Sequence, residues 1–105
     1  MNESLNSITY NELCRIEGIN HDFISAIVEY GIVQPKKETS QQDWIFETTS
    51  VYWIKKASRL HTDLEIDWLA VALVIDLLQQ KNELENENQR LTSLLQRFIE
   101  KPDKN

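Results

Sequence analysis

The C-terminal segment sets the strongest limit on the fold of this chain. Between Asp67 and Pro102 the sequence contains neither Gly nor Pro, so a helix that Asp67 caps can continue without interruption. Apolar residues recur there alternately three and four positions apart, which is the heptad repeat of a coiled coil. The a positions are Val74, Lys81, Asn88 and Leu95, and the d positions are Leu77, Leu84, Leu91 and Phe98. The sequence therefore predicts one long C-terminal helix.

The distal half of this helix needs something to pack against. At about 1.5 Å per residue the helix would be roughly 50 Å long, more than a domain of about 65 residues can cover. We expect it to pair with the same helix of a second copy, with the polar Asn88 fixing the register at some cost in stability. The alternative is a helix folded back on its own domain, and the flanking charges leave parallel and antiparallel pairing equally open. The residues expected to mediate self-association are Leu77, Leu84, Asn88, Leu91, Leu95 and Phe98.

The N-terminal part carries the start and stop signals of two short helices. Thr9 and Glu12 form a capping box, which predicts a first helix over residues 10–17. Gly18 then separates it from a second helix that Asn20 caps. Two short helices joined by a tight Gly turn are typical of a helix-turn-helix.

A small wing and a third helix are expected next. After Gly31 the letters IVQP and DWIFE flank a polar loop, which indicates two short strands. A helix should then begin near Thr48 or Thr49. Its apolar residues are Trp53, Ile54, Ala57, Leu60 and Leu64, with Lys55, Lys56 and Arg59 on its wetter side. The predicted fold is mainly α: a small winged helix-turn-helix domain over residues 1–66, then a long helix over residues 67–105, partly packed on the domain and partly coiled coil.

The sequence offers no constellation for catalysis, a metal or a cofactor. His21 and His61 stand on different predicted helices without carboxylate or Cys neighbours at ligand spacing. Cys14 follows Leu13 in the first helix, where we expect it to be a small buried hydrophobe. With two Gly in the whole chain, phosphate-cradling loops are absent. We expect a protein that is not an enzyme and that binds no metal and no cofactor.

Cysteine usage and hydropathy predict the compartment. A single Cys cannot form an internal disulfide, and the chain does not begin with the basic and apolar pattern of a signal sequence. The longest nearly apolar run, residues 68–78, is shorter than the roughly 20 residues that a membrane span needs. We expect a cytoplasmic protein that does not enter a membrane.

The distribution of charge indicates the kind of partner. The formal net charge is −6, and residues 1–35 hold five acidic residues against a single basic one, Arg15. The second helix of a DNA-binding helix-turn-helix needs donors for base edges and cations for phosphates, whereas this one presents Asp22 and Glu29. DNA would repel these carboxylates, and a basic protein surface would attract them. The pattern favours a protein partner over nucleic acid.

Several stretches of the sequence together resemble one bacterial family. They are ITYNELCRIEGI, YGIVQP, DWIFE, ASRLHTDLEIDW, AVALVIDLLQQKNELENENQRL and LLQRF, and they span about residues 7–99. This combination is similar to the CbpM family of chaperone modulators, which resemble the N-terminal part of MerR-type regulators. The resemblance implies binding to the J-domain of the DnaJ-like co-chaperone CbpA and inhibition of its work with DnaK. It also implies a basic partner surface, since J-domains carry a strongly basic helix.

The acidic residues of the helix-turn-helix region are the candidates for binding that partner. Asp22 and Glu29 lead, because both should face outward on the second helix. Trp44 offers an apolar anchor, since buried aromatic residues often dominate interfaces. The simpler interpretation of each carboxylate is a solvated surface residue. The complete set of candidates is Asp22, Glu29, Glu17, Asp43, Trp44 and Glu47.

Two other functions stay open at this point. A MerR-like transcriptional regulator would bind DNA more weakly as salt rises, with the coiled coil setting the spacing of half-sites. Its phosphate contacts would be Lys36, Lys37, Lys55, Lys56 and Arg59. A plain oligomerisation adaptor would lose its role when the heptads are broken, and would keep it after charge reversal at Asp22 and Glu29.

Overall fold

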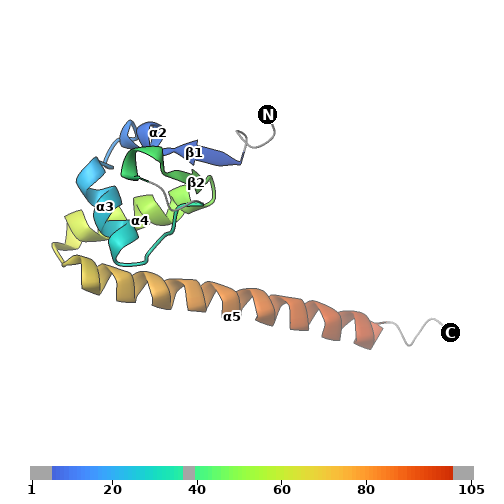
Figure 1. The fold of residues 1–105 in the computed structure, drawn as a ribbon. Coiled ribbons are helices and arrows are strands. Elements are labelled where there is room, and N and C mark those ends of the chain that lie inside the picture. Colours follow the sequence, from blue (N-terminus) through green and yellow to red (C-terminus); the bar gives the residue numbers. More distant parts are fainter. Residues whose placement is uncertain (1–5, 37–39, 101–105) are drawn as a thin grey trace. The chain divides into compact units, whose positions relative to one another are not determined.

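The computed structural model describes residues 6–36 and 40–100, and Figure 1 shows that most of them are helical. Contacts divide the chain into two compact units, residues 1–75 and residues 76–105. The elements are β1 (Ser7–Thr9), α2 (Tyr10–Cys14), α3 (His21–Glu29), the 3-10 helix η1 (Gln41–Asp43), β2 (Ile45–Glu47), α4 (Ser50–Leu64) and α5 (Trp68–Glu100). The predicted fold class is confirmed, and the predicted domain boundary at residue 67 stays a prediction.

Helix α2 begins as predicted and ends earlier than predicted. The Glu12 N–H donates to Thr9 Oγ1 (3.2 Å), and the Thr9 N–H donates to Glu12 Oε1 (2.9 Å), which completes the capping box. The helix stops at Cys14, so the prediction of a helix over residues 10–17 was wrong at its C-terminal end. The Ile16 N–H donates to the Leu13 carbonyl (3.0 Å), a tighter turn than an α-helix makes. This turn packs Ile16 against the core.

Helix α3 has the predicted cap at its N-terminal end and is terminated by a glycine. The Phe23 N–H donates to Asn20 Oδ1 (2.9 Å). At the other end Gly31 has a φ of 73°, a left-handed conformation that costs Gly little. The Ile32 N–H donates to the Ile27 carbonyl (3.0 Å), and the buried side chains of the same two residues complete a Schellman ending. Helices α2 and α3 thus form the predicted helix-turn-helix.

The small sheet differs from the predicted wing. Strand β2 forms within the DWIFE stretch, but its antiparallel partner is β1, with Ile8 opposite Phe46. Residues 32–35 form no strand. The ladder with β2 is formed by β1 instead, and Ile32 and Val33 are buried in the core, while the Lys36 N–H that follows them donates to the Ile45 carbonyl of β2 (2.7 Å). Residues 37–39 of the predicted polar loop lie outside the described residues.

Helix α4 and the start of α5 complete the core of the first unit. Ile54 and Ala57 of α4 and Val71 of α5 are fully buried, whereas Leu64 at the end of α4 is 60% exposed and contributes little. An aromatic cluster joins three helices: Phe23 lies edge-to-face against Trp68 (5.3 Å between centroids), and His61 stacks on Trp68 (4.1 Å). The fully buried side chains of the core are Leu13, Ile24, Ile27, Phe46, Ile54, Ala57, Val71 and Ile75.

Helix α5 begins at the predicted cap and contributes to both units. The Ala70 N–H donates to Asp67 Oδ1 (2.9 Å). Val71 and Ile75 are buried in the first unit, while every residue from 80 to 100 is exposed. Within the described ranges, no helix is both long enough and apolar enough to cross a lipid bilayer.

Candidate protein-interaction surface

The outer face of α3 carries two carboxylates and no basic residue other than His21. Asp22 and Glu29 are exposed and stand seven positions apart, which places them on one side of the helix two turns from each other. The side chain of Asp22 is 87% exposed, and its Oδ1 lies 3.3 Å from His21 Nδ1. Asp22 interacts favourably with the helix dipole near the N-terminus, whereas Glu29 stands at the unfavourable C-terminal end. The structure thus brings the two lead candidates onto one surface.

The segment that carries Asp43 is tied to the same helix. The Gln41 side-chain amide donates to the Tyr10 hydroxyl (3.1 Å) and to Ser25 Oγ on α3. Burial raises the pKa of the Tyr10 phenol, and the neighbouring Cys14 adds to this effect. Asp43 is exposed in η1, where it accepts a hydrogen bond from the Ser40 hydroxyl (3.0 Å). Asp43 therefore lies on a turn that is fastened to α3.

Trp44 and Glu47 differ in how much of each side chain is free. Trp44 is half-buried, and its ring lies edge-to-face against both Tyr10 and Phe46, at 6.1 Å from each centroid. Glu47 at the end of β2 is exposed and accepts a hydrogen bond from the Thr49 hydroxyl (3.5 Å). Part of the Trp44 side chain is consequently covered within its own chain.

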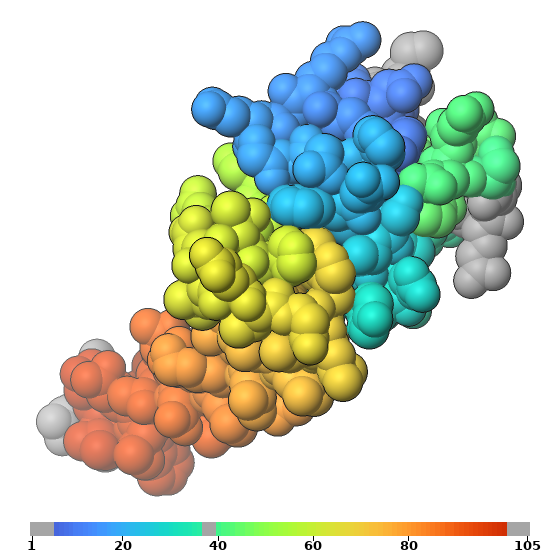
Figure 2. Space-filling model, turned by 90° about the vertical axis from the view of Figure 1, so that its left-hand side faces the viewer, coloured from blue at the N-terminus to red at the C-terminus, as the bar shows by residue number. Residues whose placement is uncertain are grey.

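Glu17 lies in another environment. It is exposed in the turn between α2 and α3, and it lines a pocket together with Lys55 and Arg59 of α4. Figure 2 shows α3 (light blue) and α4 (yellow-green) side by side on one face of the first unit. Among the candidates, Glu17 is therefore the one that shares a pocket with Lys and Arg side chains of its own chain.

The candidates for self-association are exposed along α5. The two ion pairs on this part of the helix, Lys81 with Glu85 (3.1 Å) and Arg90 with Glu87 (2.7 Å), are internal to it. Exposure is 64% for Leu77, 68% for Leu84, 48% for Leu91, 59% for Leu95 and 76% for Phe98, and Asn88 is exposed among them. These side chains have no cover within the described chain.

The sequence did not single out several exposed apolar residues, among them Tyr30, Leu69 and Leu73. Leu69 and Leu73 are 59% and 60% exposed, and Tyr30, directly after α3, is 45% exposed. The four-residue spacing from Leu69 through Leu73 to Leu77 was the available signal for a shared helix face. Tyr30 could have been found as an aromatic residue beside Glu29, because aromatic residues are enriched at interfaces.

No group of three or more His, Cys, Asp or Glu side chains within residues 6–36 and 40–100 is placed to hold a metal ion. The exposed groups described above are charged and apolar side chains.

Comparison with known proteins gives one consistent result. Residues 8–93 match the family model described as MerR HTH family regulatory protein. The chain is 38% identical over 88 residues to "Chaperone modulatory protein CbpM" of Pseudomonas putida strain W619, an alignment that covers 84% of this chain and 86% of that protein. Proteins of the same name from Citrobacter koseri and Salmonella paratyphi B are 30% and 31% identical over 96 residues, covering 91% of this chain and 94% of each.

Proposed function

Since the chain belongs to the MerR HTH regulatory family and to the CbpM chaperone modulatory proteins, we propose that it is a non-enzymatic, cytoplasmic modulator of a CbpA-like co-chaperone. It binds the co-chaperone's J-domain and thereby inhibits cooperation with DnaK. The observation that carries the proposal is the pair of exposed carboxylates, Asp22 and Glu29, on an α3 without Lys or Arg.

Glu29 lowers the stability of α3, and this unfavourable position supports a functional role for the residue. A carboxylate at the C-terminal end of a helix is destabilising by about 0.3–1 kcal/mol because it faces the negative end of the dipole. Glu29 has no ion-pair partner within the described residues. A cationic side chain of a partner would offset this repulsion on binding. The complex would then contain an ion pair at Glu29 that the free chain does not have.

Binding of the J-domain requires several contacts, because each of them contributes little free energy. A single solvent-exposed ion pair contributes about 0.2–1 kcal/mol, and complementary charge acts mainly on the association rate and on specificity. Asp22, Glu29 and Asp43 together supply steering, and the exposed part of Tyr30 supplies the aromatic contact that interfaces commonly use. Binding by this surface should therefore weaken as salt screens the charges.

The same surface disfavours the regulator alternative. A recognition helix reads base edges with donor side chains and is held by cations around it. Apart from His21, the exposed side chains of α3 are carboxylates, which would meet the phosphates of a duplex with like charge. Retained binding to DNA would need the basic residues of α4 without help from α3.

The test is a titration of the isotope-labelled full chain with the J-domain of the CbpA-like co-chaperone from the same organism, followed by amide NMR shifts at two salt concentrations. We expect saturable shifts centred on α3 and η1 that weaken with salt. The double variant Asp22→Lys, Glu29→Lys should bind roughly tenfold more weakly or worse, because juxtaposed like charges cost several kcal/mol.

A matched control makes the same change of charge away from α3. Glu83→Lys with Glu100→Lys alters two exposed carboxylates of α5 and should bind like the parent chain. Equal affinity of the Asp22 and Glu29 variant and this control would remove α3 from the interface. If the J-domain produced no shifts and duplex DNA moved the signals of Lys36, Lys55 and Arg59, the regulator function would replace the modulator.

We further propose that the exposed apolar residues of α5 pair two copies of the chain. Leu77, Leu84 and Leu91 recur every seven residues, so they share one face of the helix, and transfer of such side chains from water stabilises association. Leu84→Asp should halve the mass measured by light scattering. Asn82→Asp adds the same charge to the opposite side of the helix and should leave the mass unchanged; an unaltered mass in Leu84→Asp would refute the pairing.

A further inference from the structure

Helix α4 concentrates positive charge in an otherwise acidic chain. Lys55 and Arg59 are exposed one turn apart, and Lys56 is half-buried with its Nζ 5.7 Å from the centroid of the Tyr52 ring. Within the described residues, neither Lys55 nor Arg59 forms an ion pair with a carboxylate. Glu17 and Asp63 line the same pocket as these cations but lie beyond ion-pair distance of them, so the hydrogen-bond donors of Lys55 and Arg59 are not taken up by a carboxylate.

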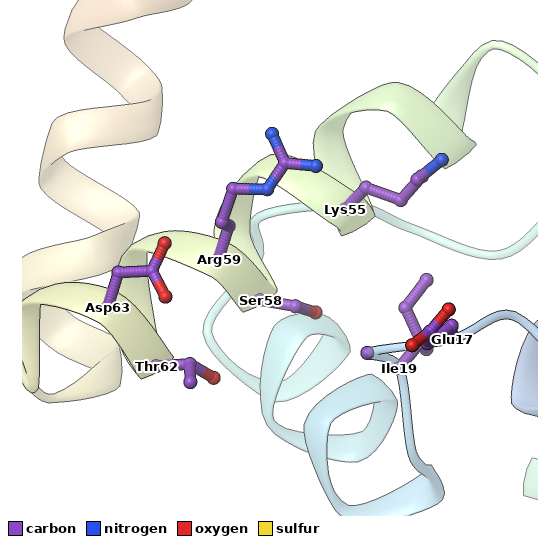
Figure 3. A pocket seen from close by; sticks show the side chains of 8 residues that line it. Glu17, Ile19, Lys55, Ser58, Arg59, Thr62 and Asp63 are labelled. Atoms are coloured by element: carbon purple, nitrogen blue, oxygen red, sulfur yellow. The ribbon is translucent and has the colours of Figure 1, made fainter.

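A polar pocket opens beside these cations. It has a volume of about 170 Å³ and lies between α4 and the turn before α3. Figure 3 shows the Ser58 side chain pointing from α4 towards the turn that carries Glu17 and Ile19. Ser58 is 3% exposed, and its Oγ has no hydrogen-bond partner. An unsatisfied buried hydroxyl is costly, so this donor is available to an acceptor that enters the pocket.

A second hollow of about 220 Å³ lies on the other side of Arg59. The helical period places Ser58 and Thr62 on one side of Arg59, and Leu60 and Leu64 on the other. Leu64 is 60% exposed. The face of α4 thus offers a buried hydroxyl, two free cations and an apolar surface side by side.

We propose that this face of α4 is a docking surface for an acidic peptide segment that carries an apolar side chain. Carboxylates of the segment bind Lys55 and Arg59, and one of these carboxylates accepts a hydrogen bond from the Ser58 hydroxyl. The apolar side chain of the segment covers Leu60 and Leu64. Charge-assisted hydrogen bonds of this kind are about twice as strong as neutral ones.

A nucleic-acid backbone fits this surface less well. It supplies anions but no apolar side chain for the hollow at Leu60 and Leu64. Glu17 and Asp63, which also line the polar pocket, repel a duplex and an acidic segment alike, so the apolar hollow is the feature that separates the two ligands. The surface uses α4 and none of the α3 carboxylates, so the inference stands independently of the modulator function.

The test uses a capped tetrapeptide, Glu-Glu-Leu-Glu, as the probe and the labelled full chain as the receptor. We expect saturable amide shifts confined to residues 17–19 and 50–64, weaker at higher salt. Two matched peptides separate the contributions: Gln-Gln-Leu-Gln lacks the charge, and Glu-Glu-Ser-Glu lacks the apolar side chain. Each should bind at least roughly fivefold more weakly, since each loses one class of contact.

Variants of the chain locate the site. Lys55→Glu with Arg59→Glu should abolish the shifts, whereas Lys81→Glu with Arg90→Glu, the same change of charge on α5, should preserve them. Equal binding of all three peptides, or shifts confined to α5, would overturn the proposal. So would tighter binding of a short DNA duplex to the same residues, which would make α4 a phosphate-binding surface.

A second variant separates docking from folding. Ser58→Ala removes a hydroxyl that has no partner in the free chain, so its melting temperature should not fall. Peptide affinity should fall about two- to tenfold, the range of one net hydrogen bond. Unchanged peptide affinity in this variant would show that the hydroxyl serves no ligand, and would remove the polar pocket from the proposal.

Discussion

The two units of the chain treat the same residue types in opposite ways. In the first unit Phe46 is completely buried, and in the second Phe98 is 76% exposed. Leu13 is likewise buried in the first unit, whereas Leu84 is 68% exposed in the second. The first unit buries a core of apolar residues within one chain although it leaves some, such as Leu69 and Leu73, exposed, while the distal helix presents its apolar residues to solvent. Stability of the first unit should accordingly be an intramolecular property, and that of the second should depend on another chain.

The largest expected effect tests this contrast with one substitution made in each unit. Phe46→Ala should lower the free energy of unfolding by about 3–5 kcal/mol, because it leaves a cavity in a packed core. That is a large part of the 5–15 kcal/mol typical of a folded domain. Phe98→Ala should leave the unfolding of the first unit unchanged and weaken self-association. Urea unfolding followed by fluorescence, with light scattering, measures both; similar losses of stability in the two variants would contradict the contrast.

A smaller effect on thermal stability is expected when Ala replaces an asparagine in each unit. Asn20→Ala removes the side chain that accepts the Phe23 N–H and should cost about 1 kcal/mol, or roughly 4–8 °C in the melting temperature of a domain of this size. Asn82→Ala in the exposed helix should instead raise helicity slightly, because Ala is the better helix former. Circular dichroism melts would record opposite signs; a loss in both variants would show that the cap contributes nothing special.

The smallest effect concerns pH and should be confined to the first unit. The pKa of Tyr10 is raised from its ordinary value of 10.0, chiefly by burial, so the folded chain holds the phenol proton more tightly than the unfolded chain does. This contribution to stability is complete below pH 10.0 and is lost as pH rises through the folded value. Residues 76–105 contain no Tyr. Urea unfolding at rising pH should show a decline that Tyr10→Phe reduces; an equal decline in that variant would assign it to other groups.

The features that could be predicted from the sequence are those that short-range hydrogen bonds and helical spacing determine. The caps at Thr9, Asn20 and Asp67 each join atoms three residues apart, so the local letters suffice to identify them. The heptads of α5 were readable for the same reason, since a helix repeats within a few residues. The outward direction of Asp22 and Glu29 also followed from helical spacing alone.

Prediction from the sequence failed for features that depend on contacts between segments far apart in the chain. Strand β2 pairs with β1, some forty residues away, and no local pattern distinguishes this partner from residues 32–35. The polar pocket depends on α4 lying against the turn that carries Glu17, so Ser58 looked like any Ser on a helix. Which of the candidate carboxylates a partner contacts depends on that partner's surface and stays a prediction.

The backbone at Glu65 has a consequence for how this chain can change by mutation. Glu65 ends α4 with a φ of 55°, a left-handed conformation that costs a residue with a side chain about 1–2 kcal/mol. Both glycines of the chain have the same kind of backbone, Gly18 and Gly31. Glu and Gly codons differ by a single nucleotide, and Glu65→Gly should recover roughly 0.5–1 kcal/mol after the added flexibility of the unfolded chain is counted. Selection for higher thermal stability could therefore stabilise the turn between α4 and α5 by a single nucleotide change.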